Sequence, residues 1–442
     1  MSLKYYPSNT HLLNLHKAMN GNQTGLTNSN LLYFSTKEAG QNLKILSVAV
    51  PDYDKLILGE DHNVEHHLCG YGMYNEEAMV RLIGESAERY ALISSSTIQK
   101  DKFFSASYNE LSGEKNVLPW ELIDIFSSSD YEGTAKAGLR LKPLSKDDKI
   151  PWLWCPSLFD PNESICIPVQ FLYTGVKLET RSVSAFSKGT AAHRSKKRAL
   201  KAALLEIIEA DAFMLKWYTD QRPRKVNIDD DVLQDMCGEL KGSLEYDLLF
   251  EDLSMPEFPG HVFSAALLGK HDGVPTVING IGAGLEPKQA CYRTLAEALA
   301  IYPMADHGLL FSPEDCLNCD DRPFHKNLDS NVMYWASSKN AEKKLATMTQ
   351  RSDSTCNISE MEDFTSNIDS ELDLLIDSLK SVSKYAVAFE ITPIELIGSG
   401  WSIMRVFIPE LVQLSLPSFP YSKHPRILQY GGVTNNMPHP LP

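Results

Sequence analysis

An almost wholly apolar helical stretch that carries two carboxylates is the feature that most constrains how this chain can fold. A helix is predicted from Ser195, a plausible N-cap, to about Tyr218. Its centre, residues 202–210, is apolar except for Glu206 and Glu209. A helix this apolar is largely buried, and buried carboxylates are costly unless they are paired or bound to a metal ion. The fold must therefore bring partners to these two acids.

A second predicted helix, earlier in the chain, repeats this spacing of acids. Residues 76–92 carry an apolar stripe with a helical period, and Glu85, Glu88 and Arg89 interrupt it. Because residues three apart share a helix face, Glu85 and Glu88 point the same way. For one pair alone, a solvated face with a Glu85–Arg89 ion pair is the simpler interpretation. The acids of the apolar helix favour a shared site instead.

A third predicted helix completes the set. We expect Pro287 in its first turn and Pro303 just past its end. It carries Arg293 and Glu297 four residues apart, and this spacing again places both on one face.

A glycine-rich segment, Gly280, Gly282 and Gly284, joins a predicted strand at residues 274–279 to this third helix. A dinucleotide-binding motif would need a third glycine at the position of Leu285, so its spacing is wrong. A tight turn with positive φ is the expected role of these glycines.

Five carboxylates that face one cleft would repel one another, by a few kcal/mol for each close pair. Mg²⁺ relieves such repulsion, because it takes oxygen ligands and keeps positions open for phosphate oxygens. Two arginines beside it suit phosphate geometry. The three helices together therefore indicate a nucleotide-phosphate site.

Composition excludes several other classes of function. The formal charge of −15 argues against non-specific binding of nucleic acid or of anionic lipid. No apolar stretch approaches the roughly 20 residues that span a bilayer, and residues 1–6 show no signal-peptide pattern. We expect a cytoplasmic protein without a transmembrane segment, with peripheral membrane association through a complex left open.

Cysteine and histidine residues give little sign of a metal centre of their own. Eight scattered cysteines are too sparse for a disulfide scaffold, so reduced thiols are expected. Cys316 and Cys319 form one Cys-x-x-Cys pair without a second pair at zinc-site spacing. A further cluster, expected in a surface loop, consists of His62, His66, His67 and Cys69.

The domain organisation expected from these patterns has one main part. Residues 1–65 form a small irregular leading segment, and residues 66–442 form the functional domain. A polar, punctuated stretch at about 313–380 is expected to be a peripheral insertion with one or two helices. Residues 385–391 and 402–408 are predicted strands.

The segment at 435–442 is rich in proline, with Pro438, Pro440 and Pro442 at alternate positions. Proline fixes φ and removes a backbone donor, so this segment is stiff and extended. Segments of this kind are commonly solvated tails. Stiffness also leaves little ordering entropy to lose if the tail enters a site.

This combination resembles the ATP-binding signature of YcaO-domain proteins. It comprises Glu-x-x-Glu-Arg on one helix, Glu-x-x-Glu on a second, Arg-x-x-x-Glu on a third and a turn at residues 187–192. The Pro-x-Pro-x-Pro ending is similar to that of the azoline-forming branch. Three segments resemble the cyclodehydratase subunit of streptolysin S-type cytolysin systems: residues 407–410, 417–420 and 424–432.

The resemblance implies a fold and a reaction. The fold would be α+β, with helices carrying Glu and Arg packed on mixed and antiparallel sheets around an ATP/Mg²⁺ cleft. ATP would phosphorylate the amide oxygen of a peptide bond that precedes Cys, Ser or Thr, after that side chain attacks the carbonyl carbon. Loss of phosphate closes a thiazoline or oxazoline ring in a ribosomally made precursor of a toxin or bacteriocin.

The resemblance also assigns roles by position. The acids for Mg²⁺ and nucleotide would be Glu85, Glu88, Glu206, Glu209 and Glu297. Further nucleotide contacts would be Arg89, Lys188 and Arg293. The catalytic tail would comprise Pro438, Pro440 and Pro442, with the carboxylate of Pro442 moving a proton. Departures from the common pattern are Arg81, Lys188, Ala210 and Ala300, which stand at or beside nucleotide contacts.

The partners implied are an E1-like protein that binds the leader peptide, an FMN-dependent azoline dehydrogenase and the precursor peptide. A homo-oligomer within this complex is expected. Two alternatives stay open: amide activation with an external nucleophile, giving a thioamide or amidine, and a non-catalytic scaffold whose ATP site has decayed. Lys188 and Ala210 are the residues that favour the scaffold.

Overall fold

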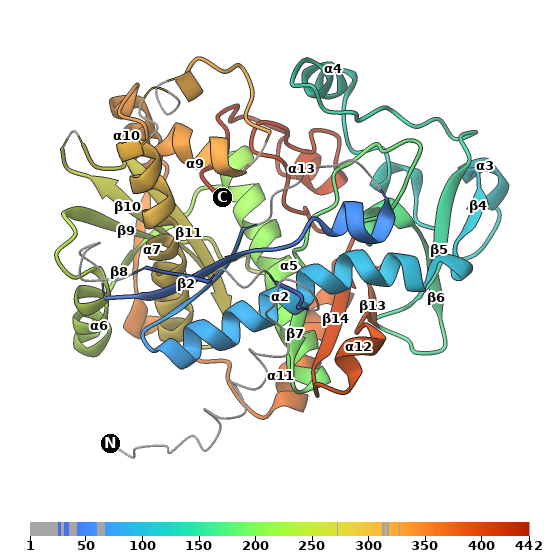
Figure 1. The fold of residues 1–442 in the computed structure, drawn as a ribbon, viewed down its shortest axis with the longest axis horizontal. Helices are drawn as coiled ribbons and strands as arrows, with labels where there is room; N and C mark the ends of the chain where they lie inside the picture. The colour runs from blue at the N-terminus through green and yellow to red at the C-terminus, as the bar shows by residue number, and fades with distance from the viewer. Residues whose placement is uncertain are drawn as a thin grey trace.

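The computed structural model describes residues 25–27, 31–34, 42–59, 67–271, 273–311, 314, 318–326 and 328–441. They form an α+β fold with four sheets, as predicted (Figure 1). The longer helices are α2 (Asn75–Ile98), α4 (Ser128–Lys136), α5 (Lys196–Tyr218), α6 (Asp231–Lys241), α7 (Pro287–Phe311), α9 (Leu328–Ala336), α10 (Ala341–Thr349) and α11 (Ile368–Lys380). The short ones are α3 (Tyr108–Leu111), α12 (Ile394–Ile397) and α13 (Pro425–Gln429).

The largest sheet has five strands in the order β11-β10-β9-β8-β12. Its strands are β11 (Val277–Gly284), β10 (His261–Gly269), β9 (Tyr246–Asp252), β8 (Arg224–Asn227) and β12 (Ser354–Asn357). All neighbours are antiparallel except β12 and β8. Side chains alternate between the two faces of a strand. In β10, Val262 and Ala266 join the core that contains α5, whereas Phe263 and Leu267 join the core beneath α6 and α7.

Helix α5 lies between this sheet and a smaller one (Figure 1). The smaller sheet has the order β13-β14-β7, with β13 (Val387–Glu390), β14 (Ser402–Phe407) and β7 (Thr190–His193). The two late strands are therefore confirmed. Contacts to β14 and β7 on one side and to β11 on the other bury most of α5, as its apolar composition predicts.

The other two sheets are small and antiparallel. One consists of β1 (Leu31–Phe34), β2 (Lys44–Ala49) and β3 (His67–Gly72), and α2 packs on it. The other consists of β4 (Phe104–Ala106), β5 (Ile150–Pro156) and β6 (Ser164–Pro168). The prediction of an irregular leading segment is thus wrong where the structure describes it. Paired strands form there because β2 buries alternate side chains against α2.

The predicted tight turn at the glycine-rich segment is also wrong, since Gly280, Gly282 and Gly284 all lie within β11. A Cβ atom on Gly280 would stand 2.4 Å from the backbone nitrogen of Ala298, and one on Gly282 would stand 2.5 Å from Thr294 Oγ1. These glycines therefore serve close packing of α7 directly on the strand. Helix α7 also continues past Pro303 to Phe311 rather than ending before it, so the proline removes one helical hydrogen bond without terminating the helix.

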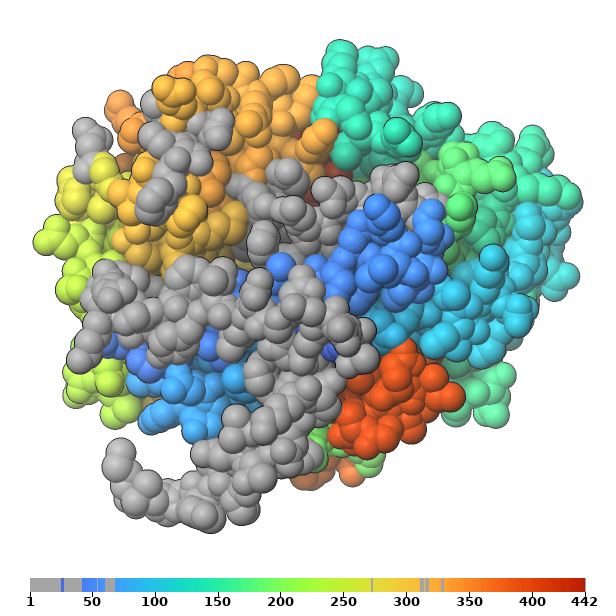
Figure 2. Space-filling view, in the orientation of Figure 1, coloured from blue at the N-terminus to red at the C-terminus, as the bar shows by residue number. Residues whose placement is uncertain are grey.

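The polar stretch after α7 holds more structure than the expected one or two helices. It contributes α9, α10 and α11, and β12 extends the large sheet. In Figure 2 residues of this stretch form part of the upper left of the molecule, while α4 projects at the upper right. Among the described residues, no helix is both long enough and apolar enough to cross a bilayer.

The close contact of α7 with β11 generates a prediction about stability. We expect Gly280→Ala to lower the free energy of unfolding by about 2–3 kcal/mol, because the new methyl group meets helix backbone that cannot rotate away. Thermal unfolding measures this change. Gly238→Ala is the control: it lies in α6 with no atom near its added Cβ, and it should be neutral or slightly stabilising. Equal losses in both variants would contradict the packing argument.

Candidate active site

The acids of α2 each accept a hydrogen bond from a strand backbone. Glu88 accepts from the N–H of Ala192 at 2.7 Å, on β7, which is an edge strand. Glu85 accepts from the N–H of Cys69 at 3.3 Å and pairs with Arg89 at 3.3 Å. The ion pair expected from the simpler interpretation of this helix is therefore present. It coexists with contacts that tie both acids to other elements, so α2 does not present a merely solvated face.

The acids of α5 meet the loop that precedes β7. Glu206 accepts from the N–H of Gly189 at 3.1 Å, and Glu209 lies 2.6 Å from the Nζ of Lys188. Gly189 has φ of +84°, and a Cβ there would stand 2.5 Å from the Ile207 side chain and from the carbonyl oxygen of Val406. Only glycine fits both constraints. The turn predicted at residues 187–192 is therefore present only up to Gly189, since residues 190–192 belong to β7. It supplies one backbone donor and one ammonium group to the acids of α5.

Arg405 on β14 holds this loop and was not predicted as a site residue. Its guanidinium donates to the carbonyl oxygens of Lys188 at 2.7 Å and Phe171 at 3.0 Å, and to Thr190 Oγ1 at 2.9 Å. Burial lowers the pKa of Arg405 to about 10, while Tyr173 and Glu206 raise it. The signal in the sequence was a single arginine within an apolar strand pattern. Arg405 is a positioning residue, because it acts through the loop it holds.

Glu297 brings the third helix to the same place. Burial raises the pKa of Glu297 to about 8; Lys188 lowers it, and Glu209, Glu206 and Glu85 raise it. Burial likewise raises the pKa of Glu206 to about 7, with Lys188 opposing and Glu209 adding to the rise. Burial and then Glu206 raise the pKa of Glu88 well above its usual value. Five acids from α2, α5 and α7 therefore influence one another. Arg293 on α7 is exposed to solvent at part of its side chain, and partial burial followed by the charge of Arg81 lowers its pKa.

These residues fit Mg²⁺ and a nucleotide by chemistry and charge. Carboxylate oxygens are the ligands that Mg²⁺ prefers. Divalent cations would remove the repulsion that adds to the effect of burial in raising the pKa values of Glu206 and Glu297. Across the described residues, no three His, Cys, Asp or Glu side chains already form a metal-binding group.

The proline-rich segment is ordered and buried up to the last described residue, so it is not a frayed tail. His439, Pro440 and Leu441 are buried and Pro438 is half-buried; Pro442 lies outside the described residues. Asn331 on α9 donates both amide hydrogens to the tail, to the carbonyl oxygens of His439 at 2.6 Å and of Leu441 at 2.7 Å. Burial lowers the pKa of His439 to about 4, so this ring is neutral.

The tail passes one helical turn from the acids of α5. The His439 ring packs edge-on against Phe213, with 6.1 Å between ring centroids, and Phe213 follows Glu209 by four residues on the same face. Trp217, a further turn along, donates its indole N–H to the carbonyl of Met437 at 3.0 Å. The tail therefore runs along α5 beside the site.

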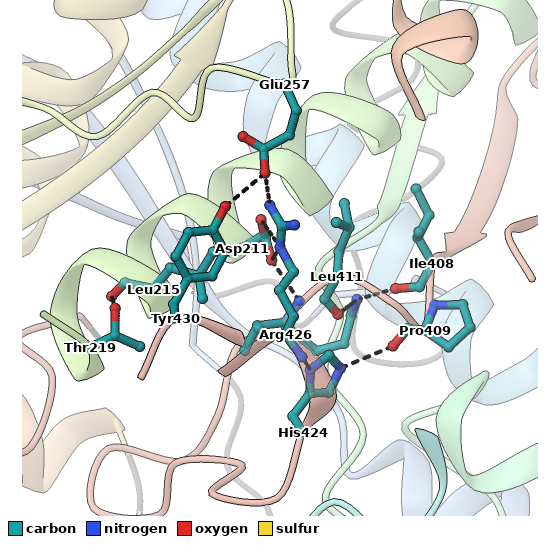
Figure 3. A network of polar contacts seen from close by, with 12 residues as sticks. Asp211, Leu215, Thr219, Glu257, Ile408, Pro409, Leu411, His424, Arg426 and Tyr430 are labelled. Carbon is teal, nitrogen blue, oxygen red and sulfur yellow. Dashed lines mark hydrogen bonds and ion pairs between the residues drawn. The ribbon is translucent and has the colours of Figure 1, made fainter. Parts of the chain in front are cut away.

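A buried polar network beyond the acids anchors the segment that leads to the tail. Figure 3 shows Arg426 reaching between Asp211 and Glu257. Its Nε lies 2.9 Å from one oxygen of Asp211, and its Nη2 lies 2.7 Å from Glu257. Tyr430 also donates to Glu257 at 3.0 Å. Asp211 and Arg426 are fully paired within this network, which indicates a structural role.

Cys69 and Arg81 are further candidate residues that the structure describes. Cys69 is on β3, and burial raises the pKa of its thiol to about 12, with Glu85 and Glu297 adding to the rise. Cys155, Cys166, Cys237, Cys291 and Cys356 are also thiols outside any disulfide. Arg81 pairs with Glu77 at 2.8 Å and stacks on Tyr71 at 4.8 Å. Predictions for His62, His66 and Cys316 lie outside the described residues.

Comparison with protein families gives one match. The family described as "YcaO cyclodehydratase, ATP-ad Mg2+-binding" matches residues 69–412. All five acids and Lys188 fall within this range. Among curated proteins, no significant sequence match was found.

Comparison with solved structures gives the same fold. A heterocyclase in complex with substrate and cofactor matches 98% of this chain with a TM-score of 0.73 and 17% identity. This chain spans 57% of that heterocyclase. YcaO from Methanopyrus kandleri, bound with AMPPCP and Mg²⁺, matches 93% of each chain with a TM-score of 0.62 and 14% identity. The E. coli microcin synthetase McbBCD complex with pro-MccB17 matches 95% of this chain and 98% of its own, with a TM-score of 0.60 and 15% identity.

The raised pKa values generate a prediction about pH. An acid whose folded pKa lies above its unfolded value of 4.5 stabilises the protein at low pH, and this contribution is lost as pH rises through the folded pKa. Relative to wild type without divalent ions, Glu297→Gln should gain about 2 kcal/mol of stability between about pH 5 and pH 9. Thermal unfolding across this range measures the difference.

The stability of the variant must be compared with that of wild type at each pH, because two buried histidines also change stability with pH. Burial lowers the pKa values of His439 and His424 to about 4, so the protein loses stability at acid pH as these rings become protonated. Glu132→Gln on the exposed side of α4 is the control and should follow the wild-type curve. If the stability of wild type and of Glu297→Gln changes with pH in the same way, the raised pKa of Glu297 is contradicted.

Proposed function

This chain belongs to the YcaO family of ATP- and Mg²⁺-binding cyclodehydratases, and we propose that it closes thiazoline or oxazoline rings in a ribosomally made precursor peptide. The observation that carries the proposal is the meeting of acids from α2, α5 and α7, where Glu88, Glu206 and Glu297 all have raised pKa values. A site of this charge needs cations, and phosphoryl transfer depends mainly on positioning and electrostatics.

In the proposed reaction, the side chain of Cys, Ser or Thr adds to the preceding carbonyl carbon of the precursor. The attacking side chain loses its proton, and ATP would supply the phosphoryl group that makes the former amide oxygen a leaving group, with ADP released and Mg²⁺ neutralising the phosphate charge. The oxygen departs as phosphate, and the amide nitrogen loses its proton as the C=N bond of the ring forms. The balance is one water removed from the peptide and one ATP hydrolysed for each ring.

We propose that this chain's residues act at four points. The set of acids proposed to serve Mg²⁺ and nucleotide is Glu85, Glu88, Glu206, Glu209 and Glu297. Arg89 and Arg293 are proposed to face the phosphates, and Lys188 adds positive charge to the nucleotide site through its contact with Glu209. Arg405 and Gly189 keep the loop in place, because the carbonyl oxygen of Lys188 and the N–H of Gly189 are both bound. The three helices therefore position the acids and the two arginines, and the loop before β7 positions Lys188.

The tail at Pro438, Pro440 and Pro442 is proposed to contribute to the chemistry at the peptide amide. Burial of His439 to Leu441 beside α5 supports a fixed position for it. The proton-moving role of a carboxylate at Pro442 is part of this proposal.

We propose a toxin or bacteriocin maturation complex of the streptolysin S type as the setting. The similar fold of a microcin synthetase complex with pro-MccB17 bound supports a complex that includes a precursor peptide. An E1-like partner and an FMN-dependent dehydrogenase are proposed as its other members. A cytoplasmic location fits this setting. An external-nucleophile reaction and a decayed scaffold are the alternative functions.

The proposal predicts a mass change. Incubation of the protein with its partner, a Cys/Ser-rich precursor and Mg-ATP should remove one water for each ring formed, as measured by intact-peptide mass spectrometry. A precursor with Ala at these positions is the control. Glu206→Gln should slow the reaction by about 100-fold or more, because it removes charge from the site.

An unchanged peptide mass with folded components would contradict ring formation. A gain in mass from a captured nucleophile would favour the external-nucleophile alternative. Absence of ATP hydrolysis on addition of partner and precursor would favour the scaffold.

The contacts of the tail generate a second prediction. Asn331→Leu keeps the size of the side chain but removes both donors to the tail. Ring formation should fall by about 10- to 100-fold through misplacement of the tail, while ATP binding stays unchanged. Single-turnover ring formation and nucleotide affinity measure the two effects.

Thr347→Val is the control, because Thr347 touches the tail only at Met437 Sδ, at 3.1 Å and upstream of the prolines. Its ring formation should match wild type. If folded Asn331→Leu forms rings at the wild-type rate, the proposed role of the tail in ring formation is wrong.

A further inference from the structure

Lys188 places a cation among the acids of the site. Its Nζ lies 2.6 Å from Glu209, and the two side chains are only 22% and 8% exposed. Glu206 on the same helix and Glu297 on α7 are also near enough to raise the pKa of Lys188, against the lowering effect of its burial. One ammonium group therefore faces three acids from two helices.

The backbone around Lys188 fixes this position. Arg405 binds the carbonyl oxygen of Lys188 at 2.7 Å, and the N–H of Gly189 binds Glu206 at 3.1 Å. The carbonyl oxygen of Gly189 accepts from the N–H of Val406 at 2.7 Å. Contacts on both sides of the residue therefore direct the lysine toward α5. A solvated lysine would not need a buried arginine to hold its backbone.

We propose that Lys188 is a built-in counter-cation, which neutralises Glu209 in place of one divalent ion. The inference rests on the proposed nucleotide site and concerns how many metal ions that site takes. With Lys188 between the acids of α5 and α7, added positive charge at Glu209 is opposed by the ammonium group. Divalent ions that arrive with ATP then bind at the other four acids. The site therefore binds fewer divalent ions than five acids could hold.

A second partly buried lysine, Lys201 on α5, provides a matched comparison with Lys188. Lys201 pairs with Glu371 of α11 at 2.8 Å, and these side chains are 27% and 7% exposed. The distance and the burial are close to those of Lys188 and Glu209. Glu371 is not one of the five acids. The Lys201–Glu371 pair is therefore charged and buried to a similar degree but lies outside the candidate nucleotide site.

Counting bound Mn²⁺, used as a paramagnetic substitute for Mg²⁺, tests the proposal. The full-length protein is titrated with Mn²⁺ in the presence of a non-hydrolysable ATP analogue, and free Mn²⁺ is measured by electron paramagnetic resonance. Lys188→Gln keeps a hydrogen-bond donor to Glu209 but removes the charge. It should bind one more Mn²⁺ than wild type, or bind the weakest Mn²⁺ at least about tenfold more tightly.

Two further variants make the outcome specific. Lys188→Arg keeps the charge and should bind Mn²⁺ as wild type does. Lys201→Gln removes a charge of similar burial elsewhere and should also leave Mn²⁺ binding unchanged. If Lys188→Gln does not fold, as judged by thermal unfolding, Lys188→Met carries the same expectation.

The results separate this inference from the proposed function. Equal Mn²⁺ number and affinity in wild type and Lys188→Gln, with the ATP analogue bound to both, would overturn the counter-cation and leave the nucleotide site standing. Failure of all variants and wild type to bind the analogue would overturn both. A change of the same size in Lys201→Gln would overturn the inference by showing a general effect of charge.

Discussion

Burial of α5 between two sheets is the constraint on which the rest of the structure depends. The helix carries Glu206, Glu209 and Asp211 within an apolar sequence, and each needs a partner because a buried carboxylate without one is unstable. The partners are the N–H of Gly189, the ammonium of Lys188 and the guanidinium of Arg426. Each partner brings a distant segment to the helix, so three acids organise much of the fold around it.

Helix α5 carries both a fully paired carboxylate, Asp211, and the candidate-site carboxylate Glu206. Asp211 accepts from Arg426 and from the N–H of Val412 at 2.8 Å, so its negative charge is well compensated. Burial raises its pKa to about 6, while Arg426 opposes the rise. Glu206 shares its surroundings with other acids instead. Complete pairing makes a network rigid, whereas incomplete pairing leaves capacity for cations that arrive with a ligand.

Sequence reasoning predicted the long helices that carry the candidate acids better than the loops and strands that surround them. The helices bearing Glu85, Glu206 and Glu297 are present, and their acids influence one another. The role of Gly280 was misjudged, because a glycine that permits close packing and one that permits positive φ look the same in a sequence. The positioning role of Arg405 was missed because it consists of hydrogen bonds to the carbonyl oxygens of Phe171 and Lys188. These residues lie far from Arg405 along the chain.

Local patterns by themselves determined where the long helices lie, which faces carry acids, and that α5 must be buried. They did so because helical period and side-chain chemistry are properties of neighbouring residues. Only the tertiary structure decided which acid meets which donor, that Lys188 points at Glu209, and that the segment before Pro442 lies buried beside α5. Those contacts join residues far apart in the chain, and their energies depend on burial and distance, which the order of residues does not specify.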